Sequence, residues 1–310
     1  MSITNLGLQV SEANAQTQDC ITDAQVKFFL DNGFLIIRRV LVGEELATIQ
    51  ASMAQLYQKG VAGVKDDPDF MYGRGVKSGQ QVLRRIEYVI DKSEPMQALL
   101  GHPFILRTVE KLQGCNFIPT WDSMVVKVPD EGIIVPWHRD AAVAAYSTAT
   151  RPIFNVDFYL DRSDLKSCLW VIPGSALWTQ EQAMERCERP GFDTADAIPV
   201  PLEAGDVILH NIQLVHGSPA GDGNALRRTV YYEFRPGEIE LEFGPHSPEY
   251  TPLKQQVLVA CLKQRSALPY TAGEKPFNYA PTGSFGLADA AVPPPTFRYP
   301  HEKYWRISAG

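Results

Sequence analysis

The segment Val135-Pro-Trp-His-Arg-Asp140 decides how the rest of the chain is interpreted. His138 and Asp140 are two residues apart, so in an extended segment their side chains point to the same side. An imidazole and a carboxylate from one strand end can therefore bind a single cation. His216, in the later segment Leu214-Val-His-Gly-Ser218, would complete a set of two histidines and one carboxylate. Such a set suits a non-haem Fe(II) ion with open coordination positions on its opposite side.

Length, composition and charge limit the class of protein. The chain has 310 residues, of which 45% are hydrophobic and 21% charged, as is typical of a globular protein with one large domain. Its net charge is −7 and it has no basic block, which argues against a nucleic-acid partner. No apolar run approaches the roughly 18 residues of a membrane-spanning helix, and the pattern of a secretory signal is missing.

Five cysteines are scattered along the chain without a CxxC pair. Their odd number and irregular spacing favour free thiols in a reducing compartment over a disulfide framework or a zinc site. We therefore expect a cytoplasmic protein with no membrane partner.

Helical patterns dominate about residues 20–115. A capping box at Thr22 opens a first helix that Gly33 ends, and residues 34–37 follow as a short buried strand. Apolar spacing, together with proline at helix starts and glycine at helix ends, predicts three further helices. These cover about residues 44–59, 94–100 and 103–113.

Residues 60–80 interleave glycines with charged side chains, which predicts a loop. A loop of this length is either a lid or binding loop of the same domain, or a disordered connection. Arg84 and Arg85 come next, and they either pair with surface carboxylates or face an anionic substrate.

From about residue 116 to 240 the apolar period changes to two. Short segments rich in valine, isoleucine, phenylalanine and tyrosine alternate with turn residues, which indicates a β-sandwich or barrel. One helix, from about 179 to 187 and opened by a capping box, interrupts them. The expected strands cover about residues 117–128, 133–137, 152–160, 168–172, 198–201, 206–216 and 227–235.

The segment of about residues 241–310 is rich in proline and aromatic residues towards its end. Proline excludes long helices or strands from the last forty or so residues, and so many aromatics are unusual in a free disordered tail. We expect this segment to pack across the core or against a partner subunit. With it, residues 1–310 form a single domain.

In five segments the chain resembles the phytanoyl-CoA dioxygenase (PhyH-like) family of Fe(II)/2-oxoglutarate-dependent oxygenases. Each segment alone is a weak signal, but together they occur in the family's order over about residues 20–235. The resemblance implies a mainly β fold with N-terminal helices, whose core is a double-stranded β-helix (jelly roll, cupin-like) with the metal in its mouth. The segments are Trp137-His-Arg-Asp140, Leu169-Trp-Val-Ile-Pro-Gly-Ser175, Gly205-Asp206, His216-Gly-Ser218 and Arg227.

The resemblance also implies the roles of individual residues. His138, Asp140 and His216 would hold a catalytic Fe(II). Arg227, eleven residues after His216, would bind the far carboxylate of 2-oxoglutarate, together with the hydroxyl of Ser218. A buried arginine suits this role because its planar fork stays charged and binds a carboxylate through two hydrogen bonds.

The family spacing also selects among competing residues. His210 is the rival of His216, since it lies in the same strand region with matching parity, and we interpret it as a packed strand histidine. His102, His246 and His301 have no carboxylate two residues away in an extended segment, so we treat them as structural or surface residues. Arg228 is adjacent to Arg227 and therefore faces the opposite way on a strand.

Further residues occupy positions where relatives line the co-substrate and substrate pocket. They lie on the strand before the metal motif, and we add Arg84 as the residue that could face an anionic substrate. These pocket residues are Trp121, Ser123, Met124, Lys127 and Arg84.

The resulting hypothesis is an oxygenase that uses Fe(II), 2-oxoglutarate and O₂ to oxidise a small molecule, releasing succinate and CO₂. Hydroxylation is the simplest outcome, in specialised metabolism for example, but desaturation, ring closure and epimerisation stay open. Two alternatives also remain: a metal-dependent hydrolase or lyase that activates water on Zn²⁺, and a non-catalytic jelly-roll binding protein. The sequence leaves open whether the chain forms a homodimer.

Overall fold

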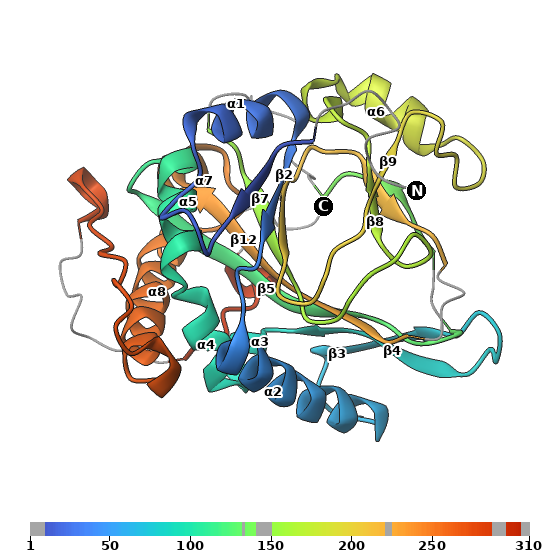
Figure 1. Cartoon of the computed structure of the whole chain (residues 1–310), viewed down its shortest axis with the longest axis horizontal. Coiled ribbons are helices and arrows are strands. Elements are labelled where there is room, and N and C mark those ends of the chain that lie inside the picture. Colours follow the sequence, from blue (N-terminus) through green and yellow to red (C-terminus); the bar gives the residue numbers. More distant parts are fainter. Residues whose placement is uncertain (1–9, 132–133, 141–150, 221–224, 287–295, 305–310) are drawn as a thin grey trace.

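The computed structural model describes residues 10–131, 134–140, 151–220, 225–286 and 296–304. Within these residues the strands form one large and one small sheet, with most helices on the outer side of the large sheet (Figure 1). In the view of Figure 1, β8 and β9 of the small sheet lie on the right, and α4, α5 and α8 lie on the left. The protein is therefore a mixed, sheet-rich fold in which the large sheet is covered on both faces.

The strand order explains which segments meet. The large sheet has the order β1-β2-β10-β7-β12-β5-β4-β3, and the small sheet has the order β6-β11-β8-β9. The strands of the large sheet are β1 (Glu12–Asn14), β2 (Phe34–Arg38), β10 (Val207–Asn211), β7 (Phe154–Tyr159), β12 (Arg227–Pro236), β5 (Phe117–Lys127), β4 (Gln81–Glu87) and β3 (Phe70–Arg74). Those of the small sheet are β6 (Val135–His138), β11 (His216–Ser218), β8 (Leu169–Val171) and β9 (Ile198–Val200).

The helices largely follow the sequence prediction. The expected helices of the N-terminal part and the capping boxes at Thr22 and Thr179 are confirmed. The helices are α1 (Asp23–Asn32), α2 (Gly43–Val61), α3 (Val89–Lys92), α4 (Glu94–Leu100), α5 (Pro103–Gln113), α6 (Gln180–Cys187), α7 (Gly237–Phe243), α8 (Tyr250–Ser266) and α9 (His301–Tyr304). None of those in the described ranges is both long and apolar enough to cross a membrane.

The side-chain alternation of β2 shows how the layers are held together. Leu35 and Ile37 belong to the core that the large sheet forms with the helices, whereas Phe34 and Ile36 belong to the core between the two sheets. A strand that is buried on both faces needs a continuous apolar run, which is the pattern of residues 34–37. Burial of each such side chain contributes about 2 kcal/mol to folding.

Several features differ from the prediction. The strand expected at about residues 206–216 is two strands, β10 and β11, which belong to different sheets. The loop predicted at residues 60–80 is wrong in part, because Phe70–Arg74 form β3 and pair with β4 as an antiparallel hairpin. Glycine and charge at these positions conceal an edge strand that is only half covered, so its apolar alternation is weak. Helix α8 was also not predicted, since its buried face includes polar residues such as Lys254 and Gln255.

The C-terminal residues that the structure describes contact the core. The hydroxyl of Tyr279 donates to the carbonyl oxygen of Phe117 at 2.7 Å, and Tyr299 is buried. Arg298 reaches Asp69, next to β3, through two hydrogen bonds of 2.7 and 2.9 Å. This segment thus secures the start of the β3–β4 hairpin.

Candidate active site

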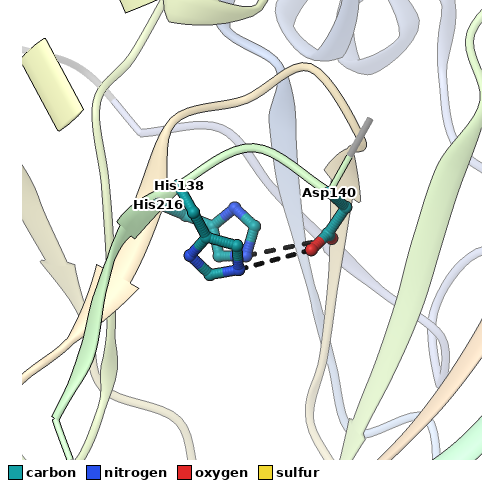
Figure 2. Close-up of side chains that lie close together, drawn as sticks. All are labelled: His138, Asp140 and His216. Carbon is teal, nitrogen blue, oxygen red and sulfur yellow. Dashed lines mark ion pairs between the residues drawn. The ribbon is translucent and has the colours of Figure 1, made fainter. Parts of the chain in front are cut away.

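Two short strands bring the three predicted metal ligands together (Figure 2). His138 is the last residue of β6 and His216 is the first residue of β11, and the two are register partners in the small sheet. Oδ1 of Asp140 lies 3.3 Å from Nε2 of His138, and its Oδ2 lies 3.9 Å from Nε2 of His216. The three ligand atoms lie within 4.8 Å of one another, so one ion can contact all of them.

The backbone orients both imidazole rings. Nδ1 of His138 bonds the carbonyl oxygen of Pro136 at 2.9 Å, and Nδ1 of His216 bonds the carbonyl oxygen of Leu214 at 3.0 Å. A carbonyl oxygen only accepts, so each Nδ1 carries a proton, and the neutral form of each ring has its lone pair on Nε2, where a metal can bind. The tautomer that metal binding requires is therefore set by the strands themselves.

The side chain of Asp140 has further partners on the inner face of the large sheet. Its Oδ2 accepts a hydrogen bond from Nδ2 of Asn155 at 2.9 Å and lies 3.0 Å from Nε2 of His210. The other ring nitrogen of His210 lies 2.9 Å from Oδ2 of Asp157. From the sequence we expected only a packing role for His210 and assigned no role to Asn155 or Asp157. No local signal reveals them, since His210 and Asp157 are 53 positions apart.

Burial and neighbouring charges compete in setting the protonation of this cluster. Burial alone would raise the pKa of Asp140, but His216, His138 and His210 hold it well below its usual value. Burial, together with the charge of His138, lowers the pKa of His216 to about 3. Burial alone would lower the pKa of His210, but the carboxylates of Asp157 and Asp140 outweigh burial and raise this pKa to about 10. Asp140 is thus ionised and His216 neutral at pH 7, which are the forms that bind a metal.

These residues fit a mononuclear Fe(II) ion. Two imidazole nitrogens and one carboxylate oxygen, with the remaining positions open, are the ligand set of non-haem Fe(II) oxygenases. A structural zinc site would need four protein ligands, and within the described ranges the cluster contains three.

The three candidate metal ligands line a cavity of about 470 Å³ between the two sheets. Most of its wall is apolar or aromatic, as in sites for small molecules. Its charged residues are Arg84, Arg85, Lys127, Glu131, Asp140, Arg227 and Glu233.

Arg227 and Lys127 form a cationic part of this wall. They are register partners on β12 and β5, both are buried, and Ser218 of β11 lines the same cavity. Nη1 of Arg227 donates to the carbonyl oxygen of Ser167 at 2.6 Å, and Nζ of Lys127 donates to the carbonyl oxygen of Pro219. Burial and the charge of Arg227 lower the pKa of Lys127 to about 7.

The other predicted pocket residues do not all face the cavity. Trp121 and Arg84 line the cavity, and Ser123 accepts a hydrogen bond of 3.1 Å from the cavity residue Arg85. Met124 is fully buried in the core between the large sheet and the helices. The expectation that Met124 lines the pocket is therefore corrected, because its side chain packs in that core and is not among the described residues that line the cavity.

His102 and His246 are not part of this cluster. His102 precedes α5 and is buried, and His246 is buried with its Nδ1 2.7 Å from Oε1 of Glu240. The side chain of His301 lies outside the described part of the chain.

The fold and the site together define a class of protein: a sheet-rich enzyme with a mononuclear non-haem iron centre. The sequence model of the phytanoyl-CoA dioxygenase (PhyH) family matches residues 29–229. This stretch is more than half of the chain, and the chain belongs to the phytanoyl-CoA dioxygenase family. It is a non-haem Fe(II)/2-oxoglutarate-dependent oxygenase, whose co-substrates are 2-oxoglutarate and O₂.

Individual relatives agree with this membership. Phytanoyl-CoA dioxygenase domain-containing protein 1 of Danio rerio is 25% identical over 283 residues, which cover 74% of this chain and 94% of that protein. The crystal structure of AviO1 from Streptomyces viridochromogenes is 26% identical with a TM-score of 0.58, covering 68% of this chain and 93% of that one. SnoK, a non-heme alpha ketoglutarate dependent carbocyclase from nogalamycin biosynthesis, shares the fold at 21% identity with a TM-score of 0.54, covering 70% and 85% of the two chains.

Proposed function

We propose that this oxygenase oxidises a small molecule that carries an anionic group, most simply by hydroxylation, with release of succinate and CO₂. The observation that carries the co-substrate assignment is the pair of buried cations, Arg227 and Lys127, in the wall of the cavity that the metal ligands also line. Within the described ranges neither residue forms an ion pair. Both donate only to backbone carbonyl oxygens among the bonds described above.

Two adjacent buried cationic groups without an ion-pair partner are electrostatically unfavourable, and burial together with the charge of Arg227 accordingly lowers the pKa of Lys127 to about 7. A dicarboxylate in the cavity would remove this cost. One end of 2-oxoglutarate would bind the metal held by His138, Asp140 and His216. The far carboxylate would then accept hydrogen bonds from Arg227 and Ser218 and lie within reach of the charge of Lys127.

The bound iron supplies the oxidative chemistry, in which decarboxylation of 2-oxoglutarate is coupled to oxidation of the substrate. The contribution of the chain is geometric and electrostatic. The backbone carbonyls fix the His138 and His216 tautomers, and Arg227 fixes the co-substrate.

The β3–β4 hairpin supports a substrate with an anionic group. Arg84 and Arg85 line the cavity on this hairpin, and the guanidinium of Arg85 lies 5.3 Å from the ring centre of Trp121, also a cavity residue. A Cβ atom on Gly73 would lie 2.1 Å from Cδ of Arg84, so glycine provides the space for the Arg84 side chain. Arg84→Ala should raise the KM of the substrate with little change in kcat, because Arg84 would bind the substrate away from the reacting bond.

We extend the proposal to the fold of the core and to the cellular location of the protein. Two facing sheets with the site between them support a double-stranded β-helix in a single domain of residues 1–310. All five cysteines are free, which supports a reducing compartment such as the cytoplasm.

Anaerobic calorimetric titration of 2-oxoglutarate into the Fe(II)-loaded protein tests the proposal. We expect saturable binding of one equivalent that Arg227→Ala weakens about a hundredfold, the value of a charge-assisted hydrogen-bond pair. Metal-dependent hydrolysis would not need Arg227, and a binding protein would not need iron. Equal affinity of the wild type and the variant, or no binding at all, would reject the co-substrate assignment.

A further inference from the structure

The buried pair His210–Asp157 stands directly behind the metal ligand Asp140, and the proposed function gives this pair no role. The side chain of His210 is 1% exposed and that of Asp157 is fully buried. Both lie on the central strands β10 and β7 of the large sheet, which are hydrogen-bonded neighbours. The pair is therefore held between two adjacent central strands of the large sheet.

The contacts of Asp140 distinguish its two carboxylate oxygens. Nδ2 of Asn155 at 2.9 Å and Nε2 of His210 at 3.0 Å both meet Oδ2. Oδ1 lies on the side of His138, 3.3 Å from its Nε2. Oδ2 also lies 3.9 Å from Nε2 of His216, but two hydrogen bonds from the large sheet already engage it, so Oδ1 is the oxygen left for a metal.

The number of oxygens that Asp140 contributes matters for this chemistry. A carboxylate can bind a metal through one oxygen or through both. With one oxygen, the chain uses three of six octahedral positions and leaves three for the co-substrate and O₂. With both oxygens, one of these three positions would be lost.

We propose that His210, held in place by Asp157, is a positioning residue that keeps Asp140 bound to the metal through a single oxygen. Nδ1 of His210 is anchored 2.9 Å from Asp157, so the ring cannot turn away from Asp140 without breaking that contact. The inference rests on the proposed function only for the identity of the metal ligands. It assigns to His210 and Asp157 an effect on metal affinity and on coordination number that acts through Asp140.

Two variants and one control test this role. Asp157→Asn keeps the shape of the side chain and removes the charge that anchors His210, whereas His210→Gln removes the bridge between the two carboxylates. The control is His246→Gln, because His246 forms an equally buried pair with Glu240, with side chains 1% and 2% exposed, and the metal cluster does not include it. The control separates loss of a buried histidine–carboxylate pair from loss of metal positioning.

The measurements are the anaerobic Fe(II) dissociation constant by equilibrium dialysis, the visible spectrum of the Co(II)-substituted protein, and the melting temperature. We expect both site variants to weaken Fe(II) binding about tenfold to a hundredfold, as for other residues that orient metal ligands. Their Co(II) spectra should change as the coordination number rises. His246→Gln should lose stability but keep the wild-type affinity and spectrum.

Wild-type affinity and spectrum in folded Asp157→Asn or His210→Gln protein would overturn the positioning role. An equal loss of affinity in the His246→Gln control would overturn it too, since the effect would then be one of stability alone. A wild-type protein that binds no Fe(II) would instead reject the metal set. The failure of the proposed function is thus distinguishable from the failure of this inference.

Discussion

Two neighbouring arginines on opposite faces of β12 have different bonding partners. Arg228, on the helix side of the large sheet, donates from Nε and Nη2 to the two oxygens of Asp161, each at 2.8 Å, and from Nη1 to the carbonyl oxygen of Gln50. Arg227, on the cavity side, has Lys127 as its strand neighbour and a single hydrogen bond to a carbonyl oxygen among those resolved. Both side chains are buried.

This difference distinguishes an arginine that stabilises the fold from an arginine that is available to bind an anion. A buried arginine that a carboxylate already neutralises holds the fold together and has nothing left to bind. A buried arginine beside a second cation destabilises the free protein and is stabilised when an anion enters. We therefore expect substitutions on the two faces to have opposite effects on stability and on ligand affinity.

The largest effect is expected at the metal end of the cavity. Asp140→Ala removes the carboxylate of the proposed ligand set, so coupled turnover should fall to the assay background, roughly a thousandfold or more. Melting temperature should stay close to that of the wild type. Succinate release and iron content check this, and wild-type-like oxidation by the variant would eliminate Asp140 as a ligand.

Arg227→Ala should produce the clearest loss of co-substrate affinity. We expect the KM for 2-oxoglutarate to rise about a hundredfold, while the free protein is as stable as the wild type or more so, because an uncompensated buried charge is removed. Steady-state kinetics and thermal unfolding without ligand measure the two effects. Marked destabilisation would show that Arg227 has a structural partner.

Arg228→Ala should lower the stability of the protein and leave its affinity for 2-oxoglutarate unchanged. Loss of one partner from a largely buried ion pair costs about 3 kcal/mol of unfolding free energy, because Asp161 loses its counter-charge. The KM for 2-oxoglutarate should stay within about twofold of the wild-type value below the melting transition. Denaturant titration and kinetics on the same preparation check this. A large rise in KM with unchanged stability would remove the contrast between the two faces.

Substitution of Lys127 should give the smallest loss of affinity for 2-oxoglutarate, and the ionisation of Lys127 should make this affinity depend on pH. Burial and the charge of Arg227 lower its pKa to about 7 in the free protein, so above this pH it must take up a proton when the dicarboxylate binds. The KM for 2-oxoglutarate should then rise with pH above 7, by up to about tenfold per unit. Lys127→Met should weaken binding about tenfold at pH 6 and flatten the profile. An equally steep profile in the variant would assign the titration to another group.

Much of the fold could be predicted because its signals are local. The capping box at Thr22, the double-sided apolar run at residues 34–37 and the alternation of β12 each depend on neighbouring residues. The β3–β4 hairpin could not be recognised, since an edge hairpin stabilised by β5 and by Arg298 shows little apolar periodicity of its own.

The same distinction between local and long-range signals applies to the candidate site. His138 and Asp140 are linked by spacing, and His216 by the order of family motifs. His210 and Asp157 become neighbours only through the pairing of β10 with β7, and no spacing rule reports that contact. The Met124 error was avoidable, because Met124 and Lys127 have opposite parity on one strand.

The anaerobic visible spectrum of the protein with Fe(II) and 2-oxoglutarate tests the central claim most directly. We predict a weak charge-transfer band that needs both components and is lost in His138→Ala. The band should require about a hundredfold more 2-oxoglutarate in Arg227→Ala and an unchanged amount in Arg228→Ala. A band with the same 2-oxoglutarate dependence in both arginine variants, or none in the metal-loaded wild type, would contradict the assignment of the cavity face of β12 to the co-substrate.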